Sequence, residues 1–270
     1  MTKINFTEEQ TEYIVNSYLK GVSRNQLRKE LGVSDNPIKR VLKENNIALR
    51  GIQETNTKRK FNINDHYFDT ESPNMAYIMG FWAADGNVHS KQNRLDLELA
   101  SLDFEILEKI REELDCERPV KIYQCQSGYI KNKLFFWSSG IKKKFAEYGI
   151  VPNKTYSPDF HAPYKLNEKY WIDYIRGFFD GDGSVTKNSS IRFSLVSVNL
   201  KFLEDLQNFL LNYYGIKTQV NLSHGPDIPN GKNLWSLYCY GDWARKIYEV
   251  LYTPNSLFLQ RKKDKWEELL

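Results

Sequence analysis

Cysteine is scarce in this chain, and the few cysteines are too widely spaced to organise a fold. Three occur among 270 residues, at Cys116, Cys125 and Cys239, and none forms a C-x-x-C pair. A disulfide framework or a cysteine-bound zinc site is therefore not expected, and this is typical of a reducing compartment.

Long apolar runs are also lacking. None approaches the roughly 18 residues that would suggest a membrane span. Residues 1–5 do not have the charged-then-apolar order of a secretory signal. We therefore expect a protein with no membrane partner that is not exported.

A strong excess of one charge is missing as well, because the formal net charge is only +4. The distribution is nevertheless uneven: residues 1–60 carry a net charge of +5, and the remainder carries −1. The simplest interpretation is a small basic module joined to a larger, balanced one. With 41% hydrophobic residues, the chain can bury a substantial core in one to three domains.

Residues 1–50 carry the start and stop signals of three short helices. Thr7 to Gln10 have the form of a capping box, and Pro37 suits the first turn of the third helix. The second and third helices, joined through Gly32, resemble a helix-turn-helix that would place the third helix in the major groove of DNA. The polar residues expected to contact DNA are Lys39, Arg40, Lys43 and Asn45. A small bundle with a solvated charged face is the competing interpretation.

Residues 51–73 contain Lys58, Arg59 and Lys60 but little periodic hydrophobicity. This composition predicts a linker. Its basic residues could lie along a DNA backbone or could simply be solvated.

Two segments of the remaining chain repeat each other. Residues 77–88, YIMGFWAADGNV, align without gaps on residues 174–185, YIRGFFDGDGSV, with seven of twelve positions identical. The apolar patterns that follow each copy predict the same order of elements, αββαββα. We therefore expect a mixed α+β fold with two pseudo-symmetric repeats, residues 74–163 and 164–270.

Gly80 and Gly177 lie within apolar helical turns of the repeated segments. Each costs about 1 kcal/mol relative to alanine in a helix. Close helix approach would offset this cost, so the two segments are expected to pack against each other at these glycines. Asp85 and Asp182 would then emerge side by side at the helix C-termini.

A carboxylate at a helix C-terminus is destabilised by the negative end of the helix dipole, and a bound cation would reverse this unfavourable interaction. Carboxylate oxygens are ligands that Mg²⁺ prefers, usually together with water and phosphate. Asp85 and Asp182 are therefore predicted to hold divalent metal ions. The competing interpretation is that each Asp-Gly pair only forms a turn after its helix. Two Asp-Gly pairs in matched segments make this interpretation weaker than one pair alone would.

Residues 78–86 and 175–183 resemble the two signature motifs of the LAGLIDADG homing endonucleases, and the resemblance extends over about residues 74–270. It implies two four-stranded antiparallel sheets that form a saddle over the DNA major groove. It also implies metal-dependent cleavage of both strands across the minor groove. Two motifs in one chain match the monomeric members, which recognise long, largely asymmetric double-stranded sites.

The same resemblance assigns roles to further residues. Asp85 and Asp182 occupy the family's metal-binding acidic position, and the backbone carbonyls of Ala84 and Gly181 are possible additional ligands. Two or three Mg²⁺ ions are expected, with Mn²⁺ or Ca²⁺ able to substitute for binding. Lys154 and Lys262 resemble the family's basic residues near each active centre, although solvated lysines are the alternative.

Asp180 takes the sixth motif position, where the first copy has Ala83, and this difference favours a supporting role for Asp180. The predicted sheets offer polar residues that alternate with apolar ones and could face DNA. They are Arg94, Asp96, Glu98, Lys121, Tyr123, Gln124, Lys131, Lys133, Arg192, Ser194, Lys217, Gln219, Asn221 and Ser236.

Two other functions remain open: a DNA-binding regulator that no longer cuts, and an intron maturase that binds RNA. Retention of both acids argues against a pure binder, and a helix-turn-helix suits B-form DNA better than RNA. The expected location is the cytoplasm, or whichever organelle or nucleoid holds the target DNA.

Overall fold

The computed structural model describes residues 4, 6–20, 22, 24–47, 49, 60–225 and 233–270. It divides into two compact units, residues 1–61 and 62–270. Within the described residues, no helix combines the length and the apolar character needed to cross a bilayer. Residues 51–59 of the predicted linker lie outside the described residues.

In the described part of the N-terminal unit, three helices pack around one small core. The helices are α1 Glu8–Leu19, α2 Arg24–Leu31 and α3 Asp35–Glu44. The predicted capping box is present, because Gln10 N donates to Thr7 Oγ1 and Thr7 N donates to Gln10 Oε1. Gly32 has φ +64°, a conformation that few other residues adopt readily, and it allows the tight connection between α2 and α3. The third helix begins two residues before Pro37.

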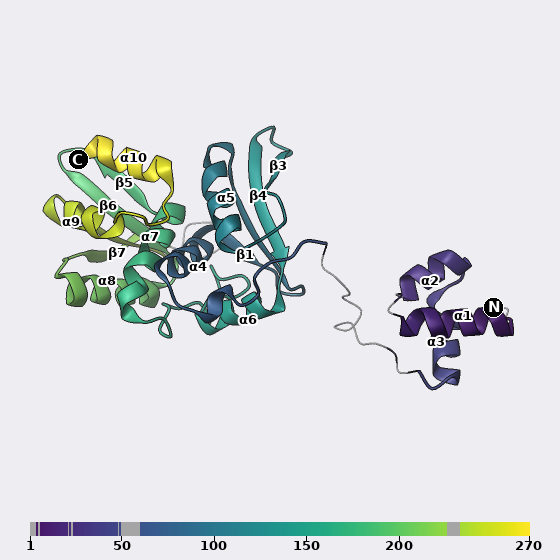
Figure 1. Cartoon of the computed structure of the whole chain (residues 1–270). Helices are drawn as coiled ribbons and strands as arrows, with labels where there is room; N and C mark the ends of the chain where they lie inside the picture. Colours follow the sequence, from purple (N-terminus) through teal and green to yellow (C-terminus); the bar gives the residue numbers. More distant parts are fainter. Residues whose placement is uncertain are drawn as a thin grey trace. The chain divides into compact units, whose positions relative to one another are not determined.

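The larger unit contains the predicted element order twice (Figure 1). The first repeat consists of α4 Pro73–Asp85, β1 Gly86–Val88, β2 Arg94–Ala100, α5 Phe104–Glu113, β3 Lys121–Gln124, β4 Ile130–Trp137 and α6 Ser139–Glu147. The second consists of α7 Trp171–Asp182, β5 Ser184–Lys187, β6 Ile191–Ser197, α8 Leu200–Tyr214, β7 Gln219–His224, β8 Leu234–Tyr240 and α9 Asp242–Leu251. The predicted α+β fold with two four-stranded antiparallel sheets is confirmed.

The two sheets share one topology, with strand orders β1-β2-β4-β3 and β5-β6-β8-β7. On each sheet, one face carries the apolar side chains that pack against helices, α5 and α6 in the first repeat and α8 and α9 in the second. The alternating polar residues therefore point to the opposite face, as the pleat of a strand requires.

A final helix, α10 Gln260–Leu269, was not predicted. Its sequence is dominated by charged residues, which gives little apolar periodicity. The helix is nevertheless anchored, because Trp266 is fully buried against Phe179 and Phe193. One large aromatic residue holds an element that periodicity alone does not reveal.

The predicted linker extends too far into the chain. Residues 67–69 form a 3-10 helix, and Phe68 is buried against Phe145. Asn62 also forms two hydrogen bonds with the carboxylate of Glu117. Residues from Asn62 onward therefore belong to the folded unit that carries the repeats.

The two repeats meet along α4 and α7, which lie together between the sheets (Figure 1). A Cβ added to Gly80 would lie 1.9 Å from the carbonyl oxygen of Tyr174, and one added to Gly177 would lie 2.0 Å from that of Tyr77. Real side chains cannot approach a backbone atom so closely. The glycines are thus required by direct contact between the helix backbones.

We predict that Gly177→Ala lowers the free energy of unfolding by about 1–3 kcal/mol, because the methyl group forces the two helices apart. Intrinsic helix propensity would act in the opposite direction, by about 1 kcal/mol. Urea denaturation provides the measurement. Gly225→Ala is the control, since its methyl group would meet nothing within 4 Å. A denaturation midpoint at or above that of the unaltered protein would contradict this packing.

Candidate functional site

Two acidic side chains meet where α4 and α7 end, at Asp85 and Asp182. A Cβ built on Gly181 would lie 2.4 Å from the Cβ of Ala84 and 3.2 Å from Oδ2 of Asp85. The Asp85 carboxylate therefore lies against Gly181 in the last turn of α7. Gly181 directly precedes Asp182. The structure brings the two acids together at the helix seam.

The electrostatic environment of this pair disfavours two bare negative charges. Both residues remain accessible to solvent, but surrounding protein removes part of their hydration. This partial burial, followed by the negative charge of Asp182, raises the pKa of Asp85 to about 6. Burial likewise raises the pKa of Asp182. A cation between the carboxylates would relieve this cost.

The donor set fits a hard cation that is only partly held by protein. Among the described residues, no group of three or more His, Cys, Asp or Glu side chains gathers to form a complete metal site. Two carboxylates are still sufficient for Mg²⁺, which commonly keeps several waters and binds substrate phosphate. Such a site would be completed by a phosphate-bearing ligand. Coordination by the carbonyls of Ala84 and Gly181 stays a prediction.

Two lysines occupy equivalent positions beside the acids. Lys154 Nζ donates to the carbonyl oxygen of Gly86 at 2.5 Å, and Lys262 Nζ donates to that of Gly183. These glycines directly follow Asp85 and Asp182 in the sequence. Each ammonium group thus contacts the same position of its own motif. The number of residues between Asp85 and Lys154 nevertheless differs from that between Asp182 and Lys262.

Burial lowers the pKa of both Lys154 and Lys262, whereas the charges of Asp85 and Asp182 raise it. The ammonium groups and the carboxylates therefore lie within one shared electrostatic field. Their catalytic roles remain predictions.

Asp180 is a structural acid that connects three parts of the second unit. It is fully buried and accepts hydrogen bonds from Tyr77 Oη at 2.9 Å, from Tyr252 Oη at 2.8 Å and from Leu259 N at 2.7 Å. The bond from Tyr77 crosses the repeat interface, and the bond from Leu259 fixes the start of α10. This helix carries Lys262, so Asp180 supports the site without touching it.

Sequence patterns alone did not identify Arg176 as part of this support. It is fully buried, and its guanidinium donates to the carbonyls of Leu257 and Leu251 and to the carboxylate of Asp173. The cation therefore fastens the segment that leads into α10 onto α7. A charged residue inside an apolar motif, where the first copy has Met79, was the available signal.

The open face of the first sheet carries a dense charge network. Lys131 and Lys133 reach Glu98 at 2.9 and 3.1 Å, while Arg94 Nε donates to Asp96 at 2.7 Å. Asp96 is only 5% exposed, so it orients neighbouring cations and is not free to read a base. Lys121 faces Lys133 across β3 and β4. Tyr123, paired with Lys131, shares this face, whereas Gln124 alternates away from it.

Among the described residues, the open face of the second sheet is nearly neutral, with Arg192 as its charged strand residue. Arg192 lies 4.9 Å from the ring centre of Tyr238, and Asn221 Nδ2 donates to the hydroxyl of Tyr238. The strand register also places Ser194, Ser236 and Gln219 on this face. Lys217, which was predicted to lie on a sheet, precedes β7, which begins at Gln219. The two faces therefore offer different chemistry to one ligand.

The predicted contact residues of the N-terminal unit lie on or next to α3. Lys39 pairs with Asp35 at 2.8 Å, and Arg40 donates to the carbonyl of Ile4. Lys43 is exposed. Asn45 Nδ2 donates to the carbonyl of Val41 and so helps to end the helix. DNA binding by this unit remains a prediction.

Together, the fold and the site define a class: a pseudo-symmetric α+β protein with paired carboxylates at the seam between its repeats. Residues 172–252 match the family model of the LAGLIDADG-like domain. Residues 172–252, which include the second motif, are therefore a LAGLIDADG-like domain, and this confirms the resemblance for that part of the chain.

Curated relatives match the chain at low sequence identity. An uncharacterised protein of Methanocaldococcus jannaschii is 27% identical over 183 residues, which cover 64% of this chain and 65% of that protein. The ribonucleoside-diphosphate reductase NrdEB subunit alpha of Bacillus subtilis is 25% identical over 202 residues, covering 68% of this chain. The match spans only 18% of the length of that subunit.

Three solved structures match the chain at low sequence identity and with TM-scores below 0.5. Variants of the homing endonuclease I-DmoI match 76% of this chain and 99% of theirs, with 14% identity and a TM-score of 0.47. The homing endonuclease I-WcaI, bound to its DNA recognition sequence, matches 73% of this chain and 90% of its own, with 13% identity and a TM-score of 0.48. The N-terminal LAGLIDADG domain of WhiA matches 71% and 91%, with 15% identity and a TM-score of 0.44. Similarities this low say nothing about the activity of the present chain.

The buried carboxyl of Asp180 leads to a prediction about pH. Burial raises its pKa from 3.8 to about 6, against the opposing effect of its hydrogen-bond donors. The folded state therefore binds a proton more tightly than the unfolded chain, and the carboxyl's contribution to stability falls as pH rises from about 4 to 6. The shift corresponds to about 3 kcal/mol. Asp180→Asn cannot titrate, so its destabilisation relative to the unaltered protein should be smaller at pH 7 than at pH 4.

Urea denaturation of metal-free protein at both pH values measures this difference. Tyr252→Phe keeps the carboxyl but removes one donor that lowers its pKa, so this control should show a pH dependence at least as strong as that of the unaltered protein. An equal or larger destabilisation of Asp180→Asn at pH 7 would mean that the native carboxyl ionises with an ordinary or lowered pKa.

Proposed function

We propose that this protein is a site-specific endonuclease that cuts both strands of double-stranded DNA with divalent metal ions. The observation that carries the proposal is the meeting of Asp85 and Asp182, each accompanied by a lysine that contacts the following glycine carbonyl. Two cuts, one in each strand, would require two sets of reactive groups. Each repeat would provide one set, an acid and a lysine. The pseudo-symmetry supplies both sets from one chain.

Mg²⁺ bound by Asp85 and Asp182 would supply an activated water and neutralise charge on the phosphate. The chain's own groups have separate tasks. Lys154 and Lys262 provide fixed positive charge beside the acids, where a phosphate oxygen gains negative charge during hydrolysis. Their hydrogen bonds to Gly86 and Gly183 hold the ammonium groups in place before DNA arrives.

The sheets would provide the binding surface for the target. Arg94, Lys121, Lys131 and Lys133 suit phosphates or guanine edges, and Gln219 and Asn221 suit adenine edges. Because one open face is charged and the other nearly neutral, the two halves of a bound duplex would meet different groups. This difference supports a long, asymmetric target site and a protein that acts as a monomer.

The direct test begins with a randomised duplex library from which bound sequences are enriched in Ca²⁺. The enriched duplex is then incubated with the protein and Mg²⁺. We expect double-strand breaks at one position in the site. Binding without any cutting in Mg²⁺ or Mn²⁺ would instead identify a DNA-binding regulator, and stronger enrichment of folded RNA would indicate a maturase.

Asp85→Asn and Asp182→Asn should each abolish paired cutting, because asparagine keeps the shape of the side chain but not the charge that holds the metal ion. Binding in Ca²⁺ should weaken far less than cutting. Asp159→Asn, at an exposed loop residue, is the matched control and should cut normally. Unchanged cutting by the double variant Asp85→Asn/Asp182→Asn would show that the metal assignment is wrong.

Lys154→Gln and Lys262→Gln should each slow single-turnover cutting by about 10²-fold, since each removes one preorganised cation from the reacting phosphate. Nicked DNA should accumulate if each lysine acts on one strand. Lys263→Gln is the control, because Lys263 pairs with Glu267 on α10. Equal rates for all three variants would leave the two site lysines without a catalytic role.

A further inference from the structure

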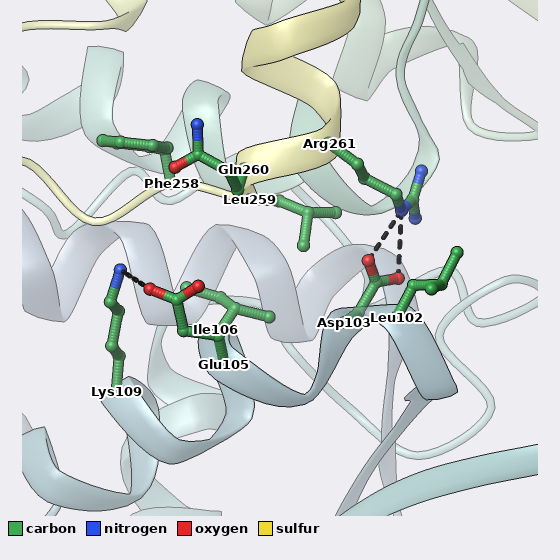
Figure 2. Close-up of a pocket in the computed structure, with 9 residues that line it drawn as sticks. All are labelled: Leu102, Asp103, Glu105, Ile106, Lys109, Phe258, Leu259, Gln260 and Arg261. Carbon is green, nitrogen blue, oxygen red and sulfur yellow. Dashed lines mark hydrogen bonds and ion pairs between the residues drawn. The ribbon is translucent and has the colours of Figure 1, made fainter.

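Arg261 is held in an unusual way at the junction of the repeats. Its Nε donates to both carboxylate oxygens of Asp103, at 2.7 and 3.0 Å (Figure 2). The side chain of Asp103 is only 2% exposed, whereas that of Arg261 is 49% exposed. The buried carboxylate therefore binds the inner nitrogen of the guanidinium, and the side chain of Arg261 remains half-exposed to solvent.

The guanidinium also carries two outer nitrogens, one of which points away from Asp103 in Figure 2. Neither of them donates a hydrogen bond to another residue in the described part of the chain. A guanidinium has five N–H donors in a fixed plane, so four remain for a ligand when only Nε is used. Paired donors of this kind match the oxygens of a phosphate.

The pair joins elements from different repeats. Asp103 ends the short 3-10 helix between β2 and α5, and Arg261 is the second residue of α10. A cavity of about 30 Å³ lies beside them, lined also by Lys109 and Phe258. It is large enough for only one or two waters. The cavity is therefore too small to bind a small-molecule ligand, and the ion pair lies at its rim.

Arg261 also lies close to the paired acids. It directly precedes Lys262, whose Nζ contacts the carbonyl of Gly183 beside Asp182. The charge of Arg261 lowers the pKa of Lys262 and that of Asp85. The first repeat has no equivalent cation, because the residue before Lys154 is Asn153.

We propose that Arg261 is a phosphate-binding residue of the nuclease centre and that Asp103, from the other repeat, positions it. This inference rests on the proposed function. The outer N–H groups of Arg261 contact a backbone phosphate at the seam and stabilise the negative charge that develops there on cutting. Since only the second repeat has this group, the two strands are cut by unequal sets of residues.

Replacement by lysine separates this role from that of a simple salt bridge between the repeats. The N–H donors of lysine all leave one terminal nitrogen, so lysine cannot pair with Asp103 through an inner nitrogen while it presents a separate, planar pair of N–H groups to a phosphate, as arginine does. A structural ion pair would tolerate Arg261→Lys. A phosphate-binding residue aimed by Asp103 would not.

The experiment uses the full-length protein and the duplex enriched in Ca²⁺ from the randomised library. Arg261→Lys, Arg261→Ala and Asp103→Asn are compared with Lys109→Ala, a control at the same cavity whose ammonium pairs with Glu105. Thermal unfolding, the salt dependence of binding in Ca²⁺ and single-turnover cutting of each strand in Mg²⁺ are measured.

We expect Arg261→Lys to unfold at the temperature of the unaltered protein yet cut one strand about 10²-fold more slowly. Arg261→Ala should also reduce the slope of log affinity against log salt by about 1, as expected for one lost phosphate contact. Asp103→Asn should slow the same strand, and Lys109→Ala should behave normally.

Unchanged cutting and an unchanged salt slope in Arg261→Lys and Arg261→Ala would overturn the inference. So would a loss of cutting that only follows the folded fraction. If the unaltered protein binds the duplex but never cuts it, the nuclease proposal fails. A reduced salt slope in Arg261→Ala would then still establish the phosphate contact, and an unchanged slope would remove it.

Discussion

The backbone contact between α4 and α7 is the constraint on which the rest of the structure depends. Gly80 and Gly177 lack the Cβ atoms that would otherwise collide with the carbonyls of Tyr174 and Tyr77. Each helix ends five residues after its contact glycine, at Asp85 and Asp182, so the two helices end at the same level. This brings Asp85 beside the last turn of α7, and it also sets one four-stranded sheet on each side of the seam. A single packing requirement therefore determines both the site and the surface around it.

The repeats agree in backbone but differ in the side chains that support the site. Lys262 is carried by α10, and Asp180 and Arg176 hold the start of that helix and the segment before it. Lys154 lies in a run of turns, and the position equivalent to Asp180 is Ala83. The open sheet faces differ in the same manner, charged in one repeat and nearly neutral in the other. A pseudo-symmetric frame with unequal side chains suits a double-stranded ligand whose two halves differ in sequence.

Much of this organisation could be predicted from the sequence, because the relevant signals are local and occur twice. The repeated glycines and the Asp-Gly pairs indicated a helix seam ending in two acids, and alternating apolar residues indicated the strands. Lys154 and Lys262 emerged only through family resemblance, since their distances along the chain from the acids differ. The contact between Arg261 and Asp103 could not be predicted, because it joins residues 158 positions apart without a shared pattern. Helix α10 was missed because one buried tryptophan, Trp266, anchors an otherwise polar segment.

The proposed function requires the paired acids to hold divalent metal ions against a DNA backbone. A crystal structure of the protein with Mn²⁺ and the enriched duplex, in which anomalous scattering locates the ions, tests this directly. We expect anomalous peaks between Asp85, Asp182 and the backbone phosphates at the seam. A well-ordered complex whose DNA lies elsewhere, or whose Mn²⁺ ions avoid both carboxylates, would contradict this expectation.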